Sequence, residues 1–112
     1  MSLSYEQQEF TKHISILIIY ANSLGVELTF GDAFRSVEQQ EIYFKAGKSR
    51  TMRSNHLRRL AIDFNFFIRG ELFYEHPLIE KIGIFWEGLN LYNRWGGNFK
   101  NLRDTPHFER NV

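Results

Sequence analysis

A nearly continuous apolar run, LAIDFNFFI at residues 60–68, contains one carboxylate, Asp63. The length of this run and its aromatic and β-branched residues predict a strand. Side chains alternate along a strand, so that one face would carry Ala61, Asp63 and Asn65 and the other Leu60, Ile62 and Phe64. A desolvated carboxylate is costly unless it is paired or bound to a metal. We therefore expect one face of this strand to pack on a core and the other to form the floor of a site.

Composition fits one folded domain with a core of large rings. The 112 residues are 43% hydrophobic and include 11 Phe, and we expect residues 1–112 to form a single domain. There is no cysteine, so any metal must be held by His, Asp or Glu. The net charge of +1 says little about partners, and the composition leaves the oligomeric state open.

The N-terminal segment does not resemble a secretory signal. Glu6 and Glu9 stand where basic residues would be expected, and the uninterrupted apolar run at residues 16–21 is short. That run is also too short to span a bilayer. We expect a protein made in the cytoplasm that does not insert into membranes.

The order of predicted elements indicates an α+β fold in which helices flank a small antiparallel sheet. Helical spacing of apolar residues from Phe10 to Leu24 predicts a first helix, capped by Ser4 and ended by Gly25. The remaining elements are a strand at 26–30, a helix at 37–46, a loop at 48–58, a strand at 60–68, a hairpin partner at 71–75, a helix from 77 to about 91 and a short extended piece at 105–109. RWGGN, between the last two, predicts turns.

Two of the four histidines have a carboxylate nearby in a suggestive pattern. His56 stands just before the strand that contains Asp63, and His107 follows Asp104 by three residues. Two histidines and one aspartate supply three ligands, the number that a catalytic zinc site uses, and Asp104 would remain to accept a proton from water. The alternative is that Asp63 only pairs with an arginine at a strand edge. His13 and His76 are interpreted as a solvent-facing helix residue and a structural residue at a helix start.

Four segments, in order, are similar to motifs of the D-alanyl-D-alanine metallopeptidase family. SNHLRRLAID at 54–63 resembles the family pattern S-x-H-x-x-G-x-A-x-D, and DTPHFE at 104–109 resembles its second zinc motif. FRSVEQQ at 34–40 resembles its arginine segment, and RWGGNF at 94–99 resembles the W-G-G turn that precedes the last ligand. The family includes zinc D,D-carboxypeptidases, D,D-dipeptidases and phage L-alanyl-D-glutamate endopeptidases, and its fold is shared with hedgehog-type signalling domains.

The resemblance implies a role for each matching residue. His56, Asp63 and His107 would bind Zn²⁺, Asp104 would be the catalytic base, and Arg35 would hold the scissile carbonyl. Ser54 and Gln39 or Gln40 fall where relatives orient the site or touch substrate. Trp95, in the turn before the last ligand segment, could form a wall of the substrate groove or belong to the core. Arg59 replaces the glycine of the family pattern, which would require a changed loop if that position has a positive φ.

The resemblance also implies a substrate and a setting. The substrate would be the peptide stem of peptidoglycan, with the choice between the L-Ala–D-Glu and D-Ala–D-Ala bonds left open. Small members without signal peptides are often phage lysis enzymes, which reach the cell wall through holin pores.

Two other functions compete with this interpretation. A His-metal nuclease could use the basic residues around His56, namely Arg50, Arg53, Arg58 and Arg59. DTPHFE would have no role in a nuclease, however, and the net charge is nearly zero, so we expect no nucleic-acid partner. A catalytically inactive zinc domain of the same fold is the second rival, and the presence of Asp104 and Arg35 argues against it.

Overall fold

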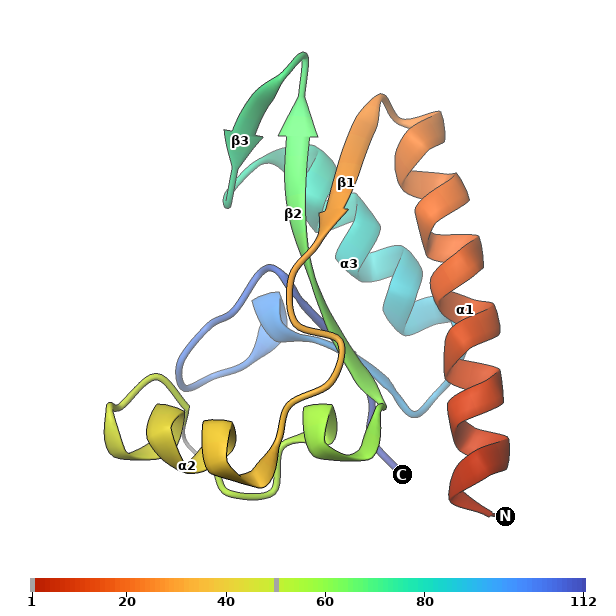
Figure 1. The fold of residues 1–112 in the computed structure, drawn as a ribbon. Helices are drawn as coiled ribbons and strands as arrows, with labels where there is room; N and C mark the ends of the chain where they lie inside the picture. Colours follow the sequence, from red (N-terminus) through yellow and green to blue (C-terminus); the bar gives the residue numbers. More distant parts are fainter. Residues whose placement is uncertain (1, 50) are drawn as a thin grey trace.

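The computed structural model describes residues 2–49 and 51–112, so Arg50 lies outside the described residues. The elements follow the order α1 (Leu3–Ser23), β1 (Val26–Phe30), α2 (Val37–Lys45), η1 (Asn55–Arg58), β2 (Ala61–Ile68), β3 (Glu71–Phe73), α3 (Pro77–Leu89), β4 (Asn93–Trp95), η2 (Gly96–Asn98) and β5 (His107–Arg110). Figure 1 shows this arrangement. The predicted α+β class, with a small antiparallel sheet and flanking helices, is confirmed.

Strand β2 is the centre of the sheet. The strand order is β1-β2-β5-β4, and β3 also pairs with β2. The outer half of β2, from Phe64 onward, pairs with β1, whereas its first three residues, Ala61 to Asp63, pair with β5. The sheet therefore changes partners at Asp63, which places this carboxylate where β1 leaves the sheet and β5 enters it.

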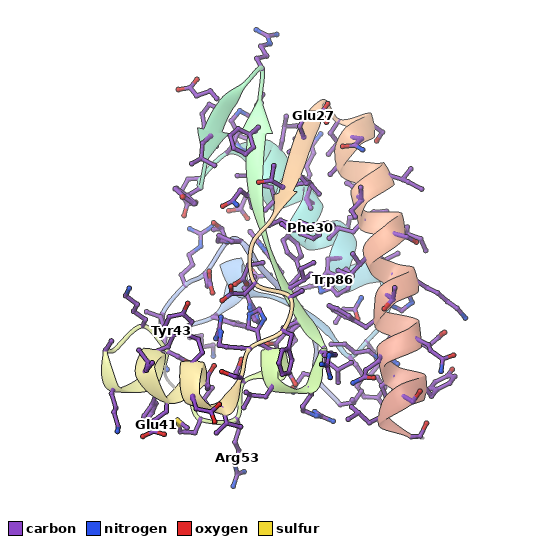
Figure 2. All side chains as sticks on the ribbon, in the orientation of Figure 1. Glu27, Phe30, Glu41, Tyr43, Arg53 and Trp86 are labelled. Carbon is purple, nitrogen blue, oxygen red and sulfur yellow. The ribbon has the colours of Figure 1, made fainter. Side chains whose placement is uncertain are left out.

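The core lies between the sheet and the helices α1 and α3. Ile62, Phe64 and Phe66 of β2 are buried in it together with residues of both helices, as their alternation predicted. Trp86 of α3 points inward (Figure 2), and its indole N–H donates to the backbone carbonyls of Arg94 and Glu109, each at 3.1 Å. This residue thereby ties α3 to β4 and β5. His13 packs edge-on against Trp86 and is half-buried, so its prediction as a solvent-facing residue was wrong.

Helix α2 lies apart from the other two helices (Figure 1). Gln40 is its one buried residue, whereas Val37, Ile42 and Phe44 are exposed. A polar side chain therefore anchors this helix, the reverse of the usual amphipathic pattern.

Some predicted boundaries differ from the structure. Ser2, not Ser4, caps α1, since its side chain accepts a hydrogen bond from the N–H of Tyr5. The loop predicted at 48–58 contains the 3-10 helix η1, and the turn-rich segment near Trp95 contains the short strand β4. No helix in the described part of the chain has the length and apolar character needed to cross a bilayer.

Candidate functional site

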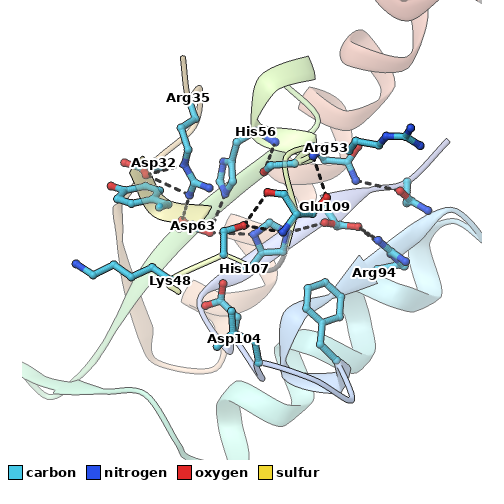
Figure 3. Close-up of a pocket in the computed structure, with 18 of the residues that line it drawn as sticks. Asp32, Arg35, Lys48, Arg53, His56, Asp63, Arg94, Asp104, His107 and Glu109 are labelled. Carbon is cyan, nitrogen blue, oxygen red and sulfur yellow. Dashed lines mark hydrogen bonds and ion pairs between the residues drawn. The ribbon is translucent and has the colours of Figure 1, made fainter. Parts of the chain in front are cut away.

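Three predicted ligand residues converge from three elements. His56 belongs to η1, Asp63 to β2 and His107 to the start of β5, where it lies directly opposite Asp63 in the antiparallel register. One possible ligand atom from each residue lies within 4.8 Å of the others, and the two imidazole centroids are 5.0 Å apart. This separation allows the three side chains to bind one ion together (Figure 3).

Local backbone structure fixes each of the three residues. The side chain of Ser54 caps η1 by accepting from the N–H of His56 at 3.2 Å. The carbonyl of Asp63 accepts from the N–H of Gly31 at 2.7 Å, and its own N–H donates to the carbonyl of Asp32 at 2.9 Å. Ser54 therefore acts through the backbone of His56, although it also lines the pocket.

His56 is buried with unused ring nitrogens. The side chain is 1% exposed, and neither nitrogen has a hydrogen-bond partner of suitable geometry among the described residues, although Nε2 lies 3.3 Å from Oδ1 of Asp63. Buried polar atoms are normally satisfied, and an exception points to a missing partner such as an ion. The donor set of two imidazoles and a carboxylate is also one that zinc uses.

His107 contacts a carboxylate through each ring nitrogen. Nδ1 lies 3.1 Å from Oδ1 of Asp63, and Nε2 lies 2.6 Å from Oε1 of Glu109. Burial alone would lower the pKa of His107, but the two hydrogen bonds outweigh burial and raise the pKa to about 9 in the metal-free chain. Burial likewise opposes ionisation of Asp63, yet the hydrogen bond to His107 and the nearby imidazole of His56 hold its pKa below the usual range.

Arg35 reaches the ligand set from the loop before α2. Its guanidinium donates to Gln40 at 2.8 Å and lies 3.3 Å from Asp32 and 3.7 Å from Asp63. It also stacks over the ring of Tyr43 at 4.7 Å. These contacts hold a permanent positive charge beside the candidate metal position.

Asp104 lies on the other wall of the pocket, in the turn before β5. Its backbone N–H donates to the carbonyl of Gly96 at 2.9 Å, and a Cβ at Gly96 would lie only 2.1 Å from the Asp104 carbonyl oxygen. The W-G-G turn thus permits the close approach that positions Asp104. Burial raises the pKa of its carboxyl, and the nearby charge of Asp63 adds to this rise, while His107 opposes it.

These groups line one open pocket of about 560 Å³. Figure 3 shows Asp63, His56 and His107 in its interior and Asp104 directed toward them. The side of α2 contributes Tyr43 and Lys48. The pocket is open to solvent.

Two predicted substrate-contacting residues do not line the pocket. Trp95 is 1% exposed, and its indole N–H donates to the carbonyl of Thr105 at 2.8 Å, so it supports the turn that carries Asp104 and His107 instead of touching substrate. Gln39 does not reach the pocket, whereas the neighbouring Gln40 bonds to Arg35. Of the two glutamines, Gln40 is the one that bonds to a pocket-lining residue, although it does not line the pocket itself.

His76 and two of the basic residues, Arg58 and Arg59, contact other parts of the protein. His76 caps α3 by accepting from the N–H of Leu78 at 3.0 Å, which agrees with its predicted structural role. Arg58 donates to the carbonyl of Val112 at 3.0 Å, and Arg59 stacks over Phe34 at 4.2 Å. Arg53 extends away from the molecule (Figure 2).

Sequence reasoning missed Glu109 and Arg94. Glu109 is 4% exposed, bonds to His107 and accepts from Arg94 Nε at 2.7 Å. The H-x-E spacing on a strand was an available signal, because residues i and i+2 share one face. Arg94, the partner of Glu109, could not be identified in this way, because its segment was predicted as a turn and not as strand β4.

Comparisons with known proteins agree with this geometry. The family model described as D-alanyl-D-alanine carboxypeptidase matches residues 47–110. The L-alanyl-D-glutamate peptidase of Listeria phage A118 is 30% identical over 99 residues, which cover 85% of this chain. The chain spans about a third of the length of that relative, 34%.

A solved structure is also similar. The L-Ala D-Glu endopeptidase ChiX of Serratia marcescens matches with a TM-score of 0.76 and 26% identity, over 92% of this chain and 78% of that chain. The four motifs, the α+β fold and the match of the family model over more than half of the sequence lead to one conclusion. The chain belongs to the D-alanyl-D-alanine carboxypeptidase family of peptidases.

Proposed function

We propose that the chain is a zinc-dependent peptidase that hydrolyses the L-Ala–D-Glu bond in the peptide stems of peptidoglycan. The observation that carries this proposal is the convergence of His56, Asp63 and His107 in an open pocket, where the ring nitrogens of His56 have no hydrogen-bond partner among the described residues. Both named relatives are described as acting on L-Ala–D-Glu, which favours this bond over D-Ala–D-Ala. The cell wall is then the place of action.

The metal would be held by Nε2 of His56, a carboxylate oxygen of Asp63 and Nδ1 of His107. Three protein ligands leave a fourth position for water or substrate, as in catalytic zinc sites. When bound, zinc supplies Lewis-acid activation of water and of the amide carbonyl. Asp63 would be neutralised by a bound cation, which would account for a carboxylate within an apolar strand.

Asp104 is the proposed general base. Its carboxylate is directed toward the ligand set (Figure 3), and burial raises its pKa toward that of a better proton acceptor. It takes the proton of the attacking water and returns it to the leaving amine.

Arg35 is the proposed electrophilic residue. Gln40, Asp32 and the ring of Tyr43 hold its guanidinium before substrate arrives. A donor held in place in this way stabilises the negative charge that develops on the carbonyl oxygen, at little cost in reorganisation.

The proposal is tested by incubating the zinc-loaded protein with purified peptidoglycan and identifying the new ends by mass spectrometry. We expect new amino termini on D-Glu, no release of free D-Ala, and loss of cleavage with a chelator that zinc reverses. Asp104→Asn should keep zinc while losing roughly 10²–10⁴-fold in rate. Arg35→Met should lose roughly 10²–10³-fold.

Glu71→Gln, on β3 and outside the pocket lining, is the control and should retain full activity. Release of D-Ala would move the assignment to a carboxypeptidase. Cleavage that persists without metal, or Asp104→Asn at the wild-type rate, would contradict the proposed mechanism.

A further inference from the structure

Arg94, Glu109 and His107 form a chain of hydrogen bonds behind the proposed ligand set (Figure 3). Arg94 on β4 lies directly opposite Glu109 on β5, and His107 stands two residues earlier on the same face of β5. One oxygen of Glu109 accepts from Nε and Nη2 of Arg94, and the other lies 2.6 Å from Nε2 of His107. Both oxygens of the Glu109 carboxylate therefore take part in hydrogen bonds.

This arrangement determines which nitrogen of His107 is free for a metal. A carboxylate can only accept hydrogen bonds, so the nitrogen that faces Glu109 must carry the hydrogen. In the metal-free chain the nitrogen that faces Asp63 also carries a hydrogen, since Asp63 is a carboxylate too. A metal bound at Nδ1 would replace that hydrogen, and the neutral imidazole would then keep its one N–H on Nε2, beside Glu109. In relation to the proposed zinc site, we infer that Glu109 is a positioning residue that fixes the Nε2–H tautomer of His107, and that Arg94 fixes the orientation of Glu109.

Glu109→Gln tests this inference because the amide can be oriented in only one way beside Arg94. The guanidinium offers two N–H groups, so the amide oxygen must turn toward Arg94 and the NH₂ group toward His107. Nε2 of His107 would then have to accept, and the hydrogen would move to Nδ1, where it blocks the metal. We expect zinc affinity to fall roughly 100-fold, at the upper end of the usual effect of such outer contacts.

A second substitution should restore part of the loss. Arg94→Met removes both donors, which lets the amide of Glu109→Gln turn its oxygen to His107 and recover the Nε2–H tautomer. We expect the double variant to bind zinc about 10-fold more tightly than Glu109→Gln, and Arg94→Met alone to lose less than about 10-fold. A glutamate with a merely structural role would give losses that add.

Affinities are measured on the metal-stripped full chain by competition with a chromophoric zinc chelator, together with the thermal midpoint of each variant. Glu80→Gln is the matched control, because Glu80 forms an ion pair with Arg103 at 2.8 Å outside the pocket lining, and its zinc affinity should equal that of the wild type. Should Glu109→Gln not fold, long-range ¹H–¹⁵N NMR of the zinc-loaded wild type decides the question, with a hydrogen expected on Nε2 of His107.

The outcomes separate this inference from the function on which it rests. If the wild type binds no zinc, both the proposed function and this inference are contradicted. A wild type that binds zinc together with a Glu109→Gln variant of unchanged affinity, additive losses in the double variant, or coordination through Nε2 of His107 would overturn the inference alone.

Discussion

Arg59 has a left-handed backbone conformation that few side chains adopt. Its φ is 56° and its ψ 37° at the end of η1, immediately before β2. The family pattern has glycine at this position, and the structure gives the physical reason: an L-residue in this region costs roughly 1–2 kcal/mol. The Phe34 ring under the guanidinium offsets part of this cost.

Two substitutions at Arg59 separate the backbone cost from the side-chain contact. Both Arg59→Ala and Arg59→Gly lose the contact with Phe34, but only the glycine variant relieves the backbone. We expect Arg59→Gly to be more stable than Arg59→Ala by about 1 kcal/mol, the opposite of the order in a helix interior. Chemical denaturation measures the difference, and equal stabilities would show that the conformation carries no strain.

The pKa of His107 predicts how the metal-free protein responds to alkaline pH. The folded value of about 9 lies above the ordinary 6.5, so between these values the folded state keeps a proton that the unfolded chain has lost. The stability from this proton is complete below pH 6.5 and is lost as pH rises through 9. The loss amounts to roughly 3 kcal/mol, at about 1.36 kcal/mol for each pKa unit.

Thermal midpoints of the chelator-treated protein between pH 6.5 and 9.5 check this expectation. The zinc-saturated protein is the control, because the metal would replace the proton on Nδ1 and the decline should be smaller. If the thermal midpoint of the metal-free protein did not change over this pH range, the raised pKa of His107 would be contradicted.

At the scale of elements, α3 and the W-G-G turn hold the Trp95 ring between two glycines. A Cβ at Gly83 of α3, or at Gly97 of η2, would lie 2.2 Å from atoms of the indole. The ring in turn bonds to the carbonyl of Thr105, between Asp104 and His107. Close packing of one ring therefore couples the position of α3 to that of the turn that carries Asp104.

Two glycines of α3 provide a matched pair of variants. Replacing a helical glycine by alanine ordinarily stabilises by about 1 kcal/mol. Gly88→Ala should follow this rule, since its Cβ would meet nothing within 4 Å. Gly83→Ala should instead destabilise by about 1–3 kcal/mol through overpacking against Trp95. Chemical denaturation of both variants measures the change in the free energy of unfolding. If Gly83→Ala stabilised the protein, the Trp95 ring would have to be able to move.

Local patterns predicted most elements because periodicity and turn residues act over short distances. The first helix, the β2–β3 hairpin and the alternation along β2 all follow from such patterns. Strand β4 could not be predicted in this way, because three residues acquire strand geometry only through their pairing with β5. The choice of Ser2 over Ser4 as the cap of α1 is an ambiguity between two suitable residues only two positions apart.

The same distinction applies to the site. The three candidate ligands and Asp104 lie within motifs, so the sequence could indicate them. The pairing of Glu109 with Arg94 depends on the β4–β5 register, and the burial of Trp95 depends on contact with Gly83 of α3 as well as with the nearby Gly97. Apart from the H-x-E spacing at residues 107–109, these contacts leave no local pattern.

At the scale of the whole molecule, a buried ion pair joins the two ends of the described chain. Glu6 in the first turns of α1 accepts from Arg110 of β5 at 2.7 and 3.1 Å, and both residues are almost fully buried. The ring of Tyr92 lies 5.5 Å from the guanidinium. Helix α1 is thereby attached to the strand that carries His107 and Glu109, so the first helix supports the pocket without lining it.

Because Glu6 and Arg110 are neighbours, a short peptide could join the ends of the chain into a closed ring. The Arg69–Gly70 turn, which lies at the opposite end of β2 from η1 (Figure 1), would be a suitable place to reopen it. The rearranged polypeptide would begin with β3 and finish with β2. Its elements would follow a different order along the sequence, but they would form the same pocket.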